Sequence, residues 1–327
     1  MNSPRIMFIR VSTRCNSNCF MCKYAGNKES FNITDEQFEM IIDKMKKEKS
    51  YKMIRFTGGE PLMHPRLPYF IKRCSEEGFK TSIITNGYLI PQKYKELVDA
   101  GISQIIFSLD GSCPEIHDKL RNFKGCFNNI MKGMDLLRQY DSKIILRVNT
   151  VVSRYNIGDL INLLNLLKER NINQWSIIPL KSSKEVWNDG NTEKYIQFYN
   201  DFQCAVEKVS IPKLLGYSKQ WAGRTKEEVH EMFYNNKLYR PRKDCNVVDI
   251  VRFYIPDTKE IIPCNCASHR KCQINIRNDS SFSTEQYTQE MRNWLKINAV
   301  NTCTGCEPIN VYLSEHPECI DEDIFNF

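Results

Sequence analysis

Three cysteines lie within eight residues near the start of the chain, in the stretch RCNSNCFMCK. The spacings of four and three residues between Cys15, Cys19 and Cys22 would place all three on one face of a helix. The intervening Asn-Ser-Asn disfavours a helix, because these side chains compete with the backbone for its hydrogen bonds. We therefore expect a loop, which can direct three thiolates at one metal centre.

The number of thiols limits the kind of metal centre. Structural zinc normally takes four ligands, whereas three thiolates with no fourth candidate nearby also fit a [4Fe–4S] cluster with one iron left open to a small molecule. Spacing alone leaves three alternatives: an iron–sulfur cluster, a zinc site, or cysteines that pack in the core.

The composition is that of an ordinary globular protein. The chain has 327 residues, 41% of them hydrophobic, which is enough for one large domain and a smaller one. It shows no signal peptide and no run of about 18 apolar residues that would span a membrane. We expect a cytoplasmic protein, in which 14 cysteines serve metal or redox chemistry rather than disulfides. The net charge of +7 is scattered, so neither a membrane nor a nucleic acid is an expected partner.

Short β-rich runs alternate with amphipathic helical segments from residue 6 to about residue 180. Thr34 and Gln37 form a capping-box pattern at the start of one such helix, and Gly101 is a C-cap signal for another. Repeated βα units of this kind form an α/β fold with a parallel sheet covered by helices, either open or curled into a barrel. The expected strands are 6–11, 53–57, 81–85, 104–109, 144–152 and 175–180.

The βα pattern ends near residue 181. Residues 191–236 look helical and linking, and residues 245–319 hold seven of the 14 cysteines in a polar stretch with little apolar periodicity. Such a stretch cannot bury enough apolar surface to be stable without a cross-link, and in the cytosol that cross-link is a cysteine-bound metal. We predict a first domain over 1–185, a linker over 186–240 and a small Cys-rich domain over 241–327.

Three further motifs follow the cysteine triplet at the ends of expected strands: TGGEP (57–61), TNG (85–87) and SLDG (108–111). Together with the triplet they closely resemble the radical S-adenosylmethionine (SAM) superfamily over roughly residues 6–180. The resemblance implies a partial (β/α)6 TIM-like barrel with its ligands at the carboxyl ends of the strands. It also implies a [4Fe–4S] cluster on Cys15, Cys19 and Cys22, with SAM bound at the open iron.

The same resemblance assigns residues to SAM. Gly58 and Gly59 would bring the backbone close to the SAM amino group, and Glu60 would act there or hold the loop. The TNG turn adds Thr85 and Asn86 to the predicted SAM site. Ser108 and Asp110, at the end of the next strand, would lie at the ribose, and Arg147 on the strand after that would pair with the SAM carboxylate. Met21 stands where the family usually has an aromatic residue near adenine, although Phe20 is adjacent.

The second group of cysteines surrounds a predicted hairpin. Cys245 and Cys264 flank VVDIVRFYIPDTKEIIP, whose turn is expected near residues 256–258, and Cys303 and Cys306 form a CX2C knuckle. As motifs, these four thiols fit zinc and an iron–sulfur cluster equally well. Behind a radical SAM core they resemble the SPASM or twitch extensions, which implies an auxiliary iron–sulfur domain with one [4Fe–4S] cluster.

Cys266 lies two residues beyond Cys264. In radical SAM epimerases a free cysteine near the auxiliary cluster donates hydrogen to the substrate radical, so Cys266 is a candidate catalytic residue. Cys272 and Cys319 have no assigned role: they would complete a second cluster, replace a ligand, or be ordinary thiols.

The resemblance leaves three functions. The first is radical oxidation or epimerisation of a small polar metabolite of sugar, cyclitol or aminoglycoside type, favoured because Cys15 leaves no room for a preceding leader-binding domain. The second is maturation of a ribosomal peptide or protein side chain. The third is a non-catalytic zinc-binding interaction protein. An electron donor such as flavodoxin or ferredoxin is the implied partner, and Asn149, Trp187, Tyr217 and Trp221 are candidate substrate contacts.

Overall fold

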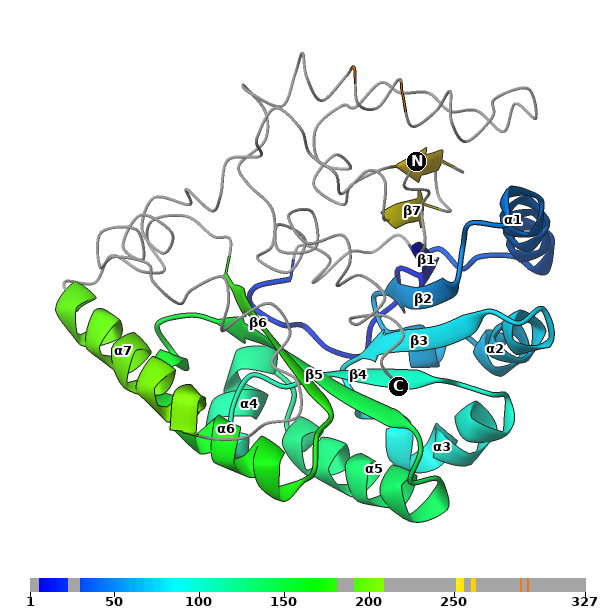
Figure 1. Cartoon of the computed structure of the whole chain (residues 1–327). Coiled ribbons are helices and arrows are strands. Elements are labelled where there is room, and N and C mark those ends of the chain that lie inside the picture. The colour runs from blue at the N-terminus through cyan, green and yellow to red at the C-terminus, as the bar shows by residue number, and fades with distance from the viewer. Residues whose placement is uncertain are drawn as a thin grey trace.

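Strands and helices alternate along most of the chain, as their hydrophobic periodicity predicts (Figure 1). The computed structural model describes residues 6–22, 30–180, 191–208, 251–255 and 260–262, together with Gln289 and Asn293. The strands are β1 (Ile6–Ser12), β2 (Met53–Gly58), β3 (Lys80–Thr85), β4 (Gln104–Ser108), β5 (Ile145–Val152), β6 (Gln174–Pro179), β7 (Val251–Ile255) and β8 (Glu260–Ile262). The helices are α1 (Asp35–Glu48), α2 (Leu67–Glu76), α3 (Ile90–Asp99), α4 (Pro114–Arg121), α5 (Cys126–Tyr140), α6 (Leu160–Glu169) and α7 (Thr192–Lys208), with 3-10 turns η1 (Pro61–Met63) and η2 (Ile157–Asp159).

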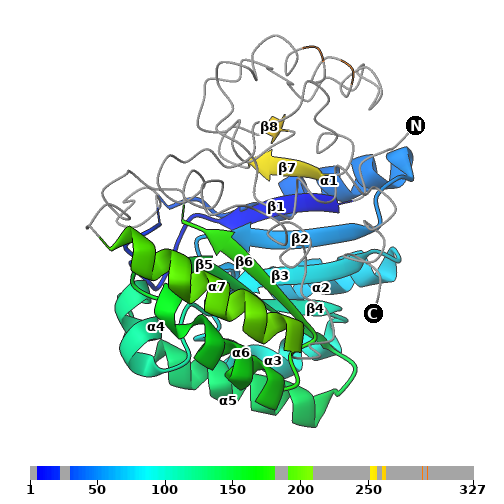
Figure 2. The same cartoon turned by 60° about the vertical axis from the view of Figure 1, so that its left-hand side comes forward.

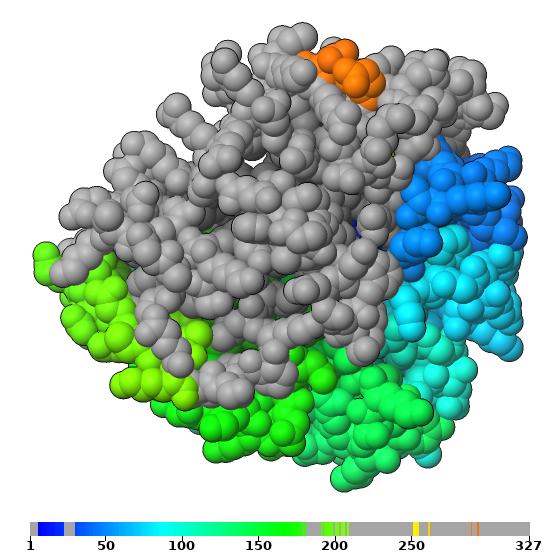
Figure 3. All heavy atoms as spheres, in the orientation of Figure 1, coloured from blue at the N-terminus to red at the C-terminus, as the bar shows by residue number. Residues whose placement is uncertain are grey.

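The strands form one sheet in the order β6-β5-β4-β3-β2-β1-β7-β8. Among the described strands, every neighbouring pair from β6 to β7 is parallel, whereas β7 and β8 are antiparallel. Helices cover the outer face of the curved sheet, and they follow one another round it from α1 to α7 (Figure 2). In the space-filling view, the coloured residues pass in the same order from blue to green along the molecule (Figure 3). The predicted α/β fold with a partial barrel is confirmed, and each of the six predicted strands agrees with the structure to within one residue at either end.

The hydrophobic core lies between the sheet and its helices. Alternate strand residues point into it, such as Ile9 of β1, Phe56 of β2 and Trp175 of β6, all fully buried. Helix α1 contributes Phe38, whose ring stacks on Phe70 of α2 at 4.2 Å between centroids. The remaining strand residues face the inside of the barrel. The loops that follow the carboxyl ends of the strands carry the motifs of the predicted site.

The ends of the helices follow local rules. The capping box predicted at the start of α1 is present: the Gln37 N–H donates to Thr34 Oγ1 at 3.2 Å, and the Thr34 N–H donates to Gln37 Oε1 at 3.0 Å. Gly101, predicted as a C-cap, follows α3 with φ of 88°, a conformation in which glycine is unstrained.

The predicted hairpin is present as β7 and β8, with Ile255 opposite Glu260. The sequence did not predict which strand this hairpin would join. In the structure, β7 pairs in parallel with β1 and extends the barrel sheet. Phe253 of β7 stacks on Phe8 of β1, with ring centroids 4.5 Å apart. The assignment of 241–327 to a separate domain stays a prediction.

Candidate active site

The cysteine triplet lies on a loop at the carboxyl end of β1, as predicted. Residues 13–22 contain no helix, which removes the possibility of a helical cysteine stripe. Cys15 and Cys22 are exposed, Cys19 is buried, and the Cys22 N–H donates to the Cys19 carbonyl at 3.0 Å to close a turn. Two of the three thiols are therefore open to an incoming metal, and the third is enclosed by protein.

Gly58 and Gly59 let the TGGEP loop approach the base of the cysteine loop. The Gly59 N–H donates to the Ser12 carbonyl and the Glu60 N–H to the Arg14 carbonyl, both at 2.7 Å. A Cβ atom at Gly58 would lie 2.1 Å from the Ser12 oxygen, and one at Gly59 would lie 2.2 Å from the Arg14 oxygen. The glycines are thus required by backbone packing within the protein, and their predicted contact with the SAM amino group stays a prediction.

Glu60 joins the TGGEP loop to the TNG turn. Its buried carboxylate accepts hydrogen bonds from the Leu62 N–H at 3.0 Å, from Thr85 Oγ1 at 2.7 Å and from the Asn86 N–H at 2.7 Å. Burial raises the pKa of Glu60 to about 7, although these three hydrogen bonds oppose the shift. The hydrogen bonds from Thr85 and Asn86 tie the TGGEP loop to the TNG turn. A contact of Glu60 with the SAM amino group stays a prediction.

The TNG turn supports the cysteine loop directly. The side-chain amide of Asn86 donates to the side-chain oxygen of Asn16 at 2.7 Å, across 70 positions of sequence. Thr85 Oγ1 in turn accepts from the Gly87 N–H at 2.9 Å, which fixes the turn itself. Asn86 therefore positions the residues between Cys15 and Cys19, and a contact of Thr85 or Asn86 with SAM stays a prediction.

Asp110 lies deeper than its predicted place at the ribose implies. Its carboxylate is fully buried, with one oxygen accepting from the Val151 N–H at 2.8 Å and the other paired with Arg121 at 2.7 Å. Burial raises the pKa of Asp110, and the Arg121 guanidinium opposes the shift. Ser108 is half-buried opposite Asn149 in the sheet register. The ribose contacts of Ser108 and Asp110 remain predictions.

Arg121 was missed by the sequence analysis. It ends α4, where a basic residue is common because the helix dipole favours one, and Lys119 shares that position in the last turn. No signal in the sequence separates the two. Only the tertiary structure places Arg121 against Asp110 and near the cysteine loop.

The inside of the barrel is polar. Arg147 is buried on β5 and its Nε donates to Asn149 Oδ1 at 3.1 Å. Lower in the barrel, Arg55 donates to Ser82 Oγ at 2.9 Å and to Gln104 Oε1 at 3.2 Å. These buried hydrogen bonds join β2, β3 and β4 across the interior, where Arg55 also lies over the ring of Phe8. Pairing of Arg147 with the SAM carboxylate stays a prediction.

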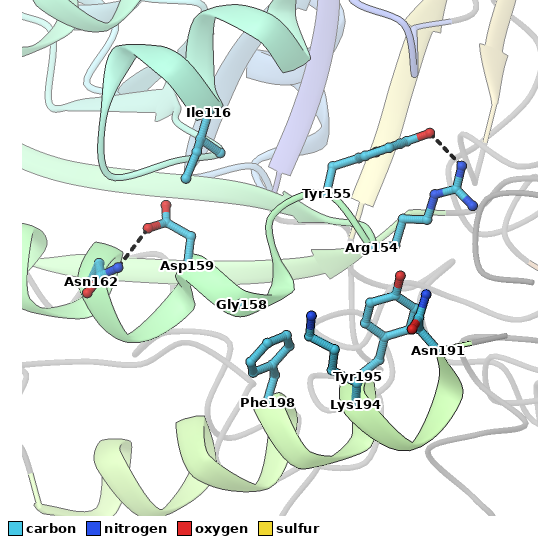
Figure 4. Close-up of a pocket in the computed structure, with 10 residues that line it drawn as sticks. All are labelled: Ile116, Arg154, Tyr155, Gly158, Asp159, Asn162, Asn191, Lys194, Tyr195 and Phe198. Atoms are coloured by element: carbon cyan, nitrogen blue, oxygen red, sulfur yellow. Dashed lines mark hydrogen bonds between the residues drawn. The ribbon is translucent and has the colours of Figure 1, made fainter. Parts of the chain in front are cut away.

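A pocket of about 330 Å³ opens beside the cysteine loop (Figure 4). Phe20 of that loop contacts Tyr155 of the pocket edge to face, with ring centroids 5.7 Å apart. Asp159 is held at the pocket by Ser112, whose N–H and hydroxyl donate to its two oxygens at 2.7 and 2.6 Å. The lining residues are Ile116, Arg154, Tyr155, Gly158, Asp159, Asn162, Asn191, Lys194, Tyr195 and Phe198. No motif in the sequence predicts this pocket.

A comparison with protein families identifies the barrel. Residues 9–167 match the family described as the radical SAM superfamily. Residues 9–167 are a radical SAM domain. The match spans the cysteine loop and all three strand-end motifs, and it ends within α6.

Individual relatives share this radical SAM domain. The chain is 29% identical to an AdoMet-dependent heme synthase of Methanosarcina barkeri over 171 residues, which are 51% of this chain and 48% of that protein. It is 25% identical to a probable GTP 3′,8-cyclase of Sulfolobus acidocaldarius, over 75% of this chain and 72% of that protein. The chain therefore spans about half the length of the first of these relatives.

A solved structure has the same fold. Streptococcus suis SuiB bound to the precursor peptide SuiA superposes with a TM-score of 0.65 and 15% sequence identity, covering 95% of this chain and 71% of SuiB. No helix in the described ranges is long and apolar enough to cross a membrane.

The radical SAM superfamily uses a [4Fe–4S] cluster and SAM, and the donor set of the loop fits that cluster. In the described part of the chain, no three His, Cys, Asp or Glu side chains are placed to share one metal ion. A [4Fe–4S] cluster differs from a single ion in that each thiolate binds a separate iron. The loop supplies three thiols, one for each of three irons, and leaves the fourth iron of such a cluster without a cysteine ligand.

The predicted auxiliary site lies outside the described residues. This applies to the ligand candidates Cys245, Cys264, Cys303 and Cys306, and to Cys266, Cys272 and Cys319. The structure does describe the hairpin strands between Cys245 and Cys264. The auxiliary cluster and the role of Cys266 stay predictions.

Proposed function

We propose that the protein is a radical SAM enzyme whose [4Fe–4S] cluster is held by Cys15, Cys19 and Cys22. The observation that carries the proposal is the support of the cysteine loop from two sides. The TGGEP loop bonds to its backbone at Ser12 and Arg14, and the TNG turn bonds to Asn16. A loop fixed in this way presents its thiols in one arrangement before any cluster binds, so little ordering entropy opposes binding.

The remaining site residues would bind and orient SAM. Arg147 would pair with the SAM carboxylate, and Ser108 with Asn149 would offer polar groups to the ribose. Ser108 ends β4 and lies opposite Asn149 in the middle of β5, and Arg147 precedes Asn149 by two residues on the same strand. The backbone around Gly58 and Gly59 would lie near the amino group. When bound, the cluster and SAM supply a 5′-deoxyadenosyl radical that abstracts hydrogen from a substrate C–H bond. The walls of the barrel would exclude water from that radical.

The C-terminal cysteines would form a second redox centre. We propose one auxiliary [4Fe–4S] cluster on Cys245, Cys264, Cys303 and Cys306, with Cys266 beside it as a hydrogen donor. The parallel pairing of β7 with β1 attaches the hairpin between Cys245 and Cys264 to the sheet of the radical SAM domain. Flavodoxin or ferredoxin would deliver the electron.

For the substrate we propose a peptide or protein side chain ahead of a small polar metabolite. The likeness to SuiB is one of fold, but it extends over 95% of this chain, which is more than the radical SAM domain alone. Neither the heme synthase nor the GTP cyclase is named for a sugar or cyclitol substrate, so the sugar-type substrate predicted from the sequence has no support from these relatives.

Iron content tests the proposal. Protein purified without oxygen and reconstituted with iron and sulfide should hold about eight irons per chain if both clusters form, and about four if only the first does. Replacing Cys15, Cys19 and Cys22 together by Ala should remove about four irons and abolish reductive cleavage of SAM. A triple variant that keeps the wild-type iron content and cleaves SAM would refute the assignment.

Deuterium transfer identifies the substrate. A peptide or metabolite labelled at the reacting carbon should deliver deuterium into 5′-deoxyadenosine. Solvent deuterium in the product would then indicate an epimerase, whereas its absence together with a two-electron oxidised product would indicate an oxidoreductase.

A further inference from the structure

Arg121 is a buried cation next to the cysteine loop. Its guanidinium lies 2.7 Å from the carboxylate of Asp110, and the two side chains are only 11% and 0% exposed. Burying two charges is unfavourable unless each is well paired, so this ion pair is costly to break by removing one partner. The surroundings of Asp110 reinforce it: the Val151 N–H donates to the other carboxylate oxygen at 2.8 Å.

The backbone around Asp110 is also held. The Asp110 N–H donates to Nδ1 of His117 at 3.0 Å, and the Asn156 side-chain amide donates to the Asp110 carbonyl at 2.8 Å. Asp110 thus has hydrogen bonds at its N–H, its carbonyl and one carboxylate oxygen, and its other carboxylate oxygen forms the ion pair. It is a fixed anchor for Arg121.

Arg121 contacts the cysteine loop at two points. A terminal nitrogen of its guanidinium lies 3.9 Å from Cys19 Sγ, within the range of a hydrogen bond to sulfur. Its main-chain carbonyl accepts a hydrogen bond from the Ser17 hydroxyl at 2.9 Å. Ser17 Oγ is in turn 3.1 Å from Cys19 Sγ. The end of α4 therefore holds both the backbone near Cys19 and its sulfur.

The number of available protons decides which of these groups can donate a hydrogen bond to the Cys19 sulfur when metal is bound. Ser17 has one hydroxyl proton, and it donates that proton to the Arg121 carbonyl. In the free thiol, the Cys19 S–H can donate to Ser17 Oγ. A metal-bound thiolate has no proton to donate, so among these groups the Arg121 N–H is the donor that remains directed at sulfur.

We infer that Arg121, anchored by Asp110, is a positioning residue that donates a hydrogen bond to the Cys19 sulfur in the bound cluster. The inference rests on the proposed function, because it requires Cys19 to be a cluster ligand. Hydrogen bonds to cluster sulfurs and nearby positive charge make reduction easier, because the reduced cluster carries one more negative charge. The ion pair would thus help to set the reduction potential of the cluster.

Replacing Arg121 and replacing Asp110 should shift the reduction potential of the cluster in opposite directions. Arg121→Met removes the donor and the cation, and the buried Asp110 left behind takes up a proton rather than staying charged. The potential should then become more negative. Asp110→Asn keeps the side-chain shape but leaves the Arg121 charge uncompensated near the sulfur, so the potential should become more positive.

The test is an EPR-monitored redox titration of the reconstituted full-length protein. The C-terminal ligand candidates Cys245, Cys264, Cys303 and Cys306 are replaced by Ala in every variant, so that the signal comes from the first cluster alone. Arg138→Met is the matched control. Arg138 donates to the carbonyls of Ser142, Ile144 and Asn171 beside the amino end of β5, the opposite end of the barrel, and this variant should lose stability without a shift in potential.

Opposite shifts in Arg121→Met and Asp110→Asn support the inference. If Arg121→Met does not fold, Arg121→Lys, which keeps the charge without the planar fork, should give a smaller negative shift, and Ser17→Ala should lose iron faster to a chelator. Unchanged potentials, or shifts of the same sign in both variants, overturn the inference while leaving the proposed function intact. A parent protein that holds no cluster overturns both.

Discussion

At the scale of single residues, Glu60 connects the most segments of the site. It lies in the TGGEP loop, its carboxylate binds the TNG turn through Thr85 and Asn86, and its N–H donates to Arg14 at the start of the cysteine loop. These partners come from two other motifs of the radical SAM domain, the TNG turn and the cysteine loop. A buried carboxylate with three donors fixes their relative positions better than an apolar contact, because hydrogen bonds are directional.

The buried carboxyl group of Glu60 should make the stability of the folded protein depend on pH. Its pKa in the folded protein is raised by burial from the ordinary 4.5 to about 7, so the folded state binds this proton more tightly than the unfolded chain. The resulting stabilisation is fully present below pH 4.5 and is lost as pH rises through about 7. Relative to Glu60→Gln, which cannot ionise, the wild type should lose about 3 kcal/mol across this interval.

Melting temperatures of both proteins, measured from about pH 5 to about pH 8, check this prediction. The difference between the wild type and Glu60→Gln should fall steadily with rising pH. Parallel profiles would show that Glu60 keeps one protonation state throughout.

At the scale of elements, two loops from neighbouring strands are packed backbone to backbone. The loop after β2 approaches the loop after β1 so closely that side chains at Gly58 and Gly59 are excluded by carbonyl oxygens. Neither carbonyl can move far, since each accepts a hydrogen bond from the opposite loop. The position of the cysteines is therefore set by the strand pairing of β1 and β2 and transmitted through this contact.

Gly59→Ala should displace the cysteine loop. The new methyl group would sit 2.2 Å from the Arg14 oxygen, and relieving that overlap should cost about 3 kcal/mol of stability and lower the iron content. Gly78→Ala is the control. Gly78 has φ of 79° with no atom within 4 Å of an added Cβ, so it should lose about 1 kcal/mol and keep its iron. Equal iron loss in both variants would contradict the proposed packing role.

At the scale of the whole molecule, β7 joins residues near 250 to the first strand of the chain. The sheet order places β1 inside the sheet, between β2 and β7, rather than at its edge. An exposed parallel edge strand next to the cysteine loop would be free to pair with another chain. Pairing with β7 covers that edge, and β8 then becomes the end of the sheet.

The stacking of Phe8 on Phe253 should couple the stability of β1 to that of β7. Stacked rings of this kind typically contribute about 0.5–1.5 kcal/mol beyond their burial. A double-mutant cycle with Phe8→Ala and Phe253→Ala, followed by urea unfolding and circular dichroism, should give a coupling energy in that range. A coupling energy of zero would mean that β7 does not rest on β1 in solution.

The sequence by itself determined the βα order, the strands to within a residue, the cysteine loop and the motifs at strand ends. These features depend on local signals: apolar periodicity, the capping box at Thr34, and the Asn-Ser-Asn that prevents a helix. Glu60 could be predicted as a site residue because it lies inside a motif. Its neighbours could not be read in the same way, since they come from other strands.

The tertiary structure alone decided what the site residues touch. It buried Asp110 against Arg121, brought Asn86 to Asn16, and paired β7 with β1. Each of these contacts joins positions that are far apart along the chain, except for Asp110 and Arg121, whose contact depends on the turn into α4. Such contacts are fixed by strand register and helix packing, and a linear pattern of residue types carries no record of either.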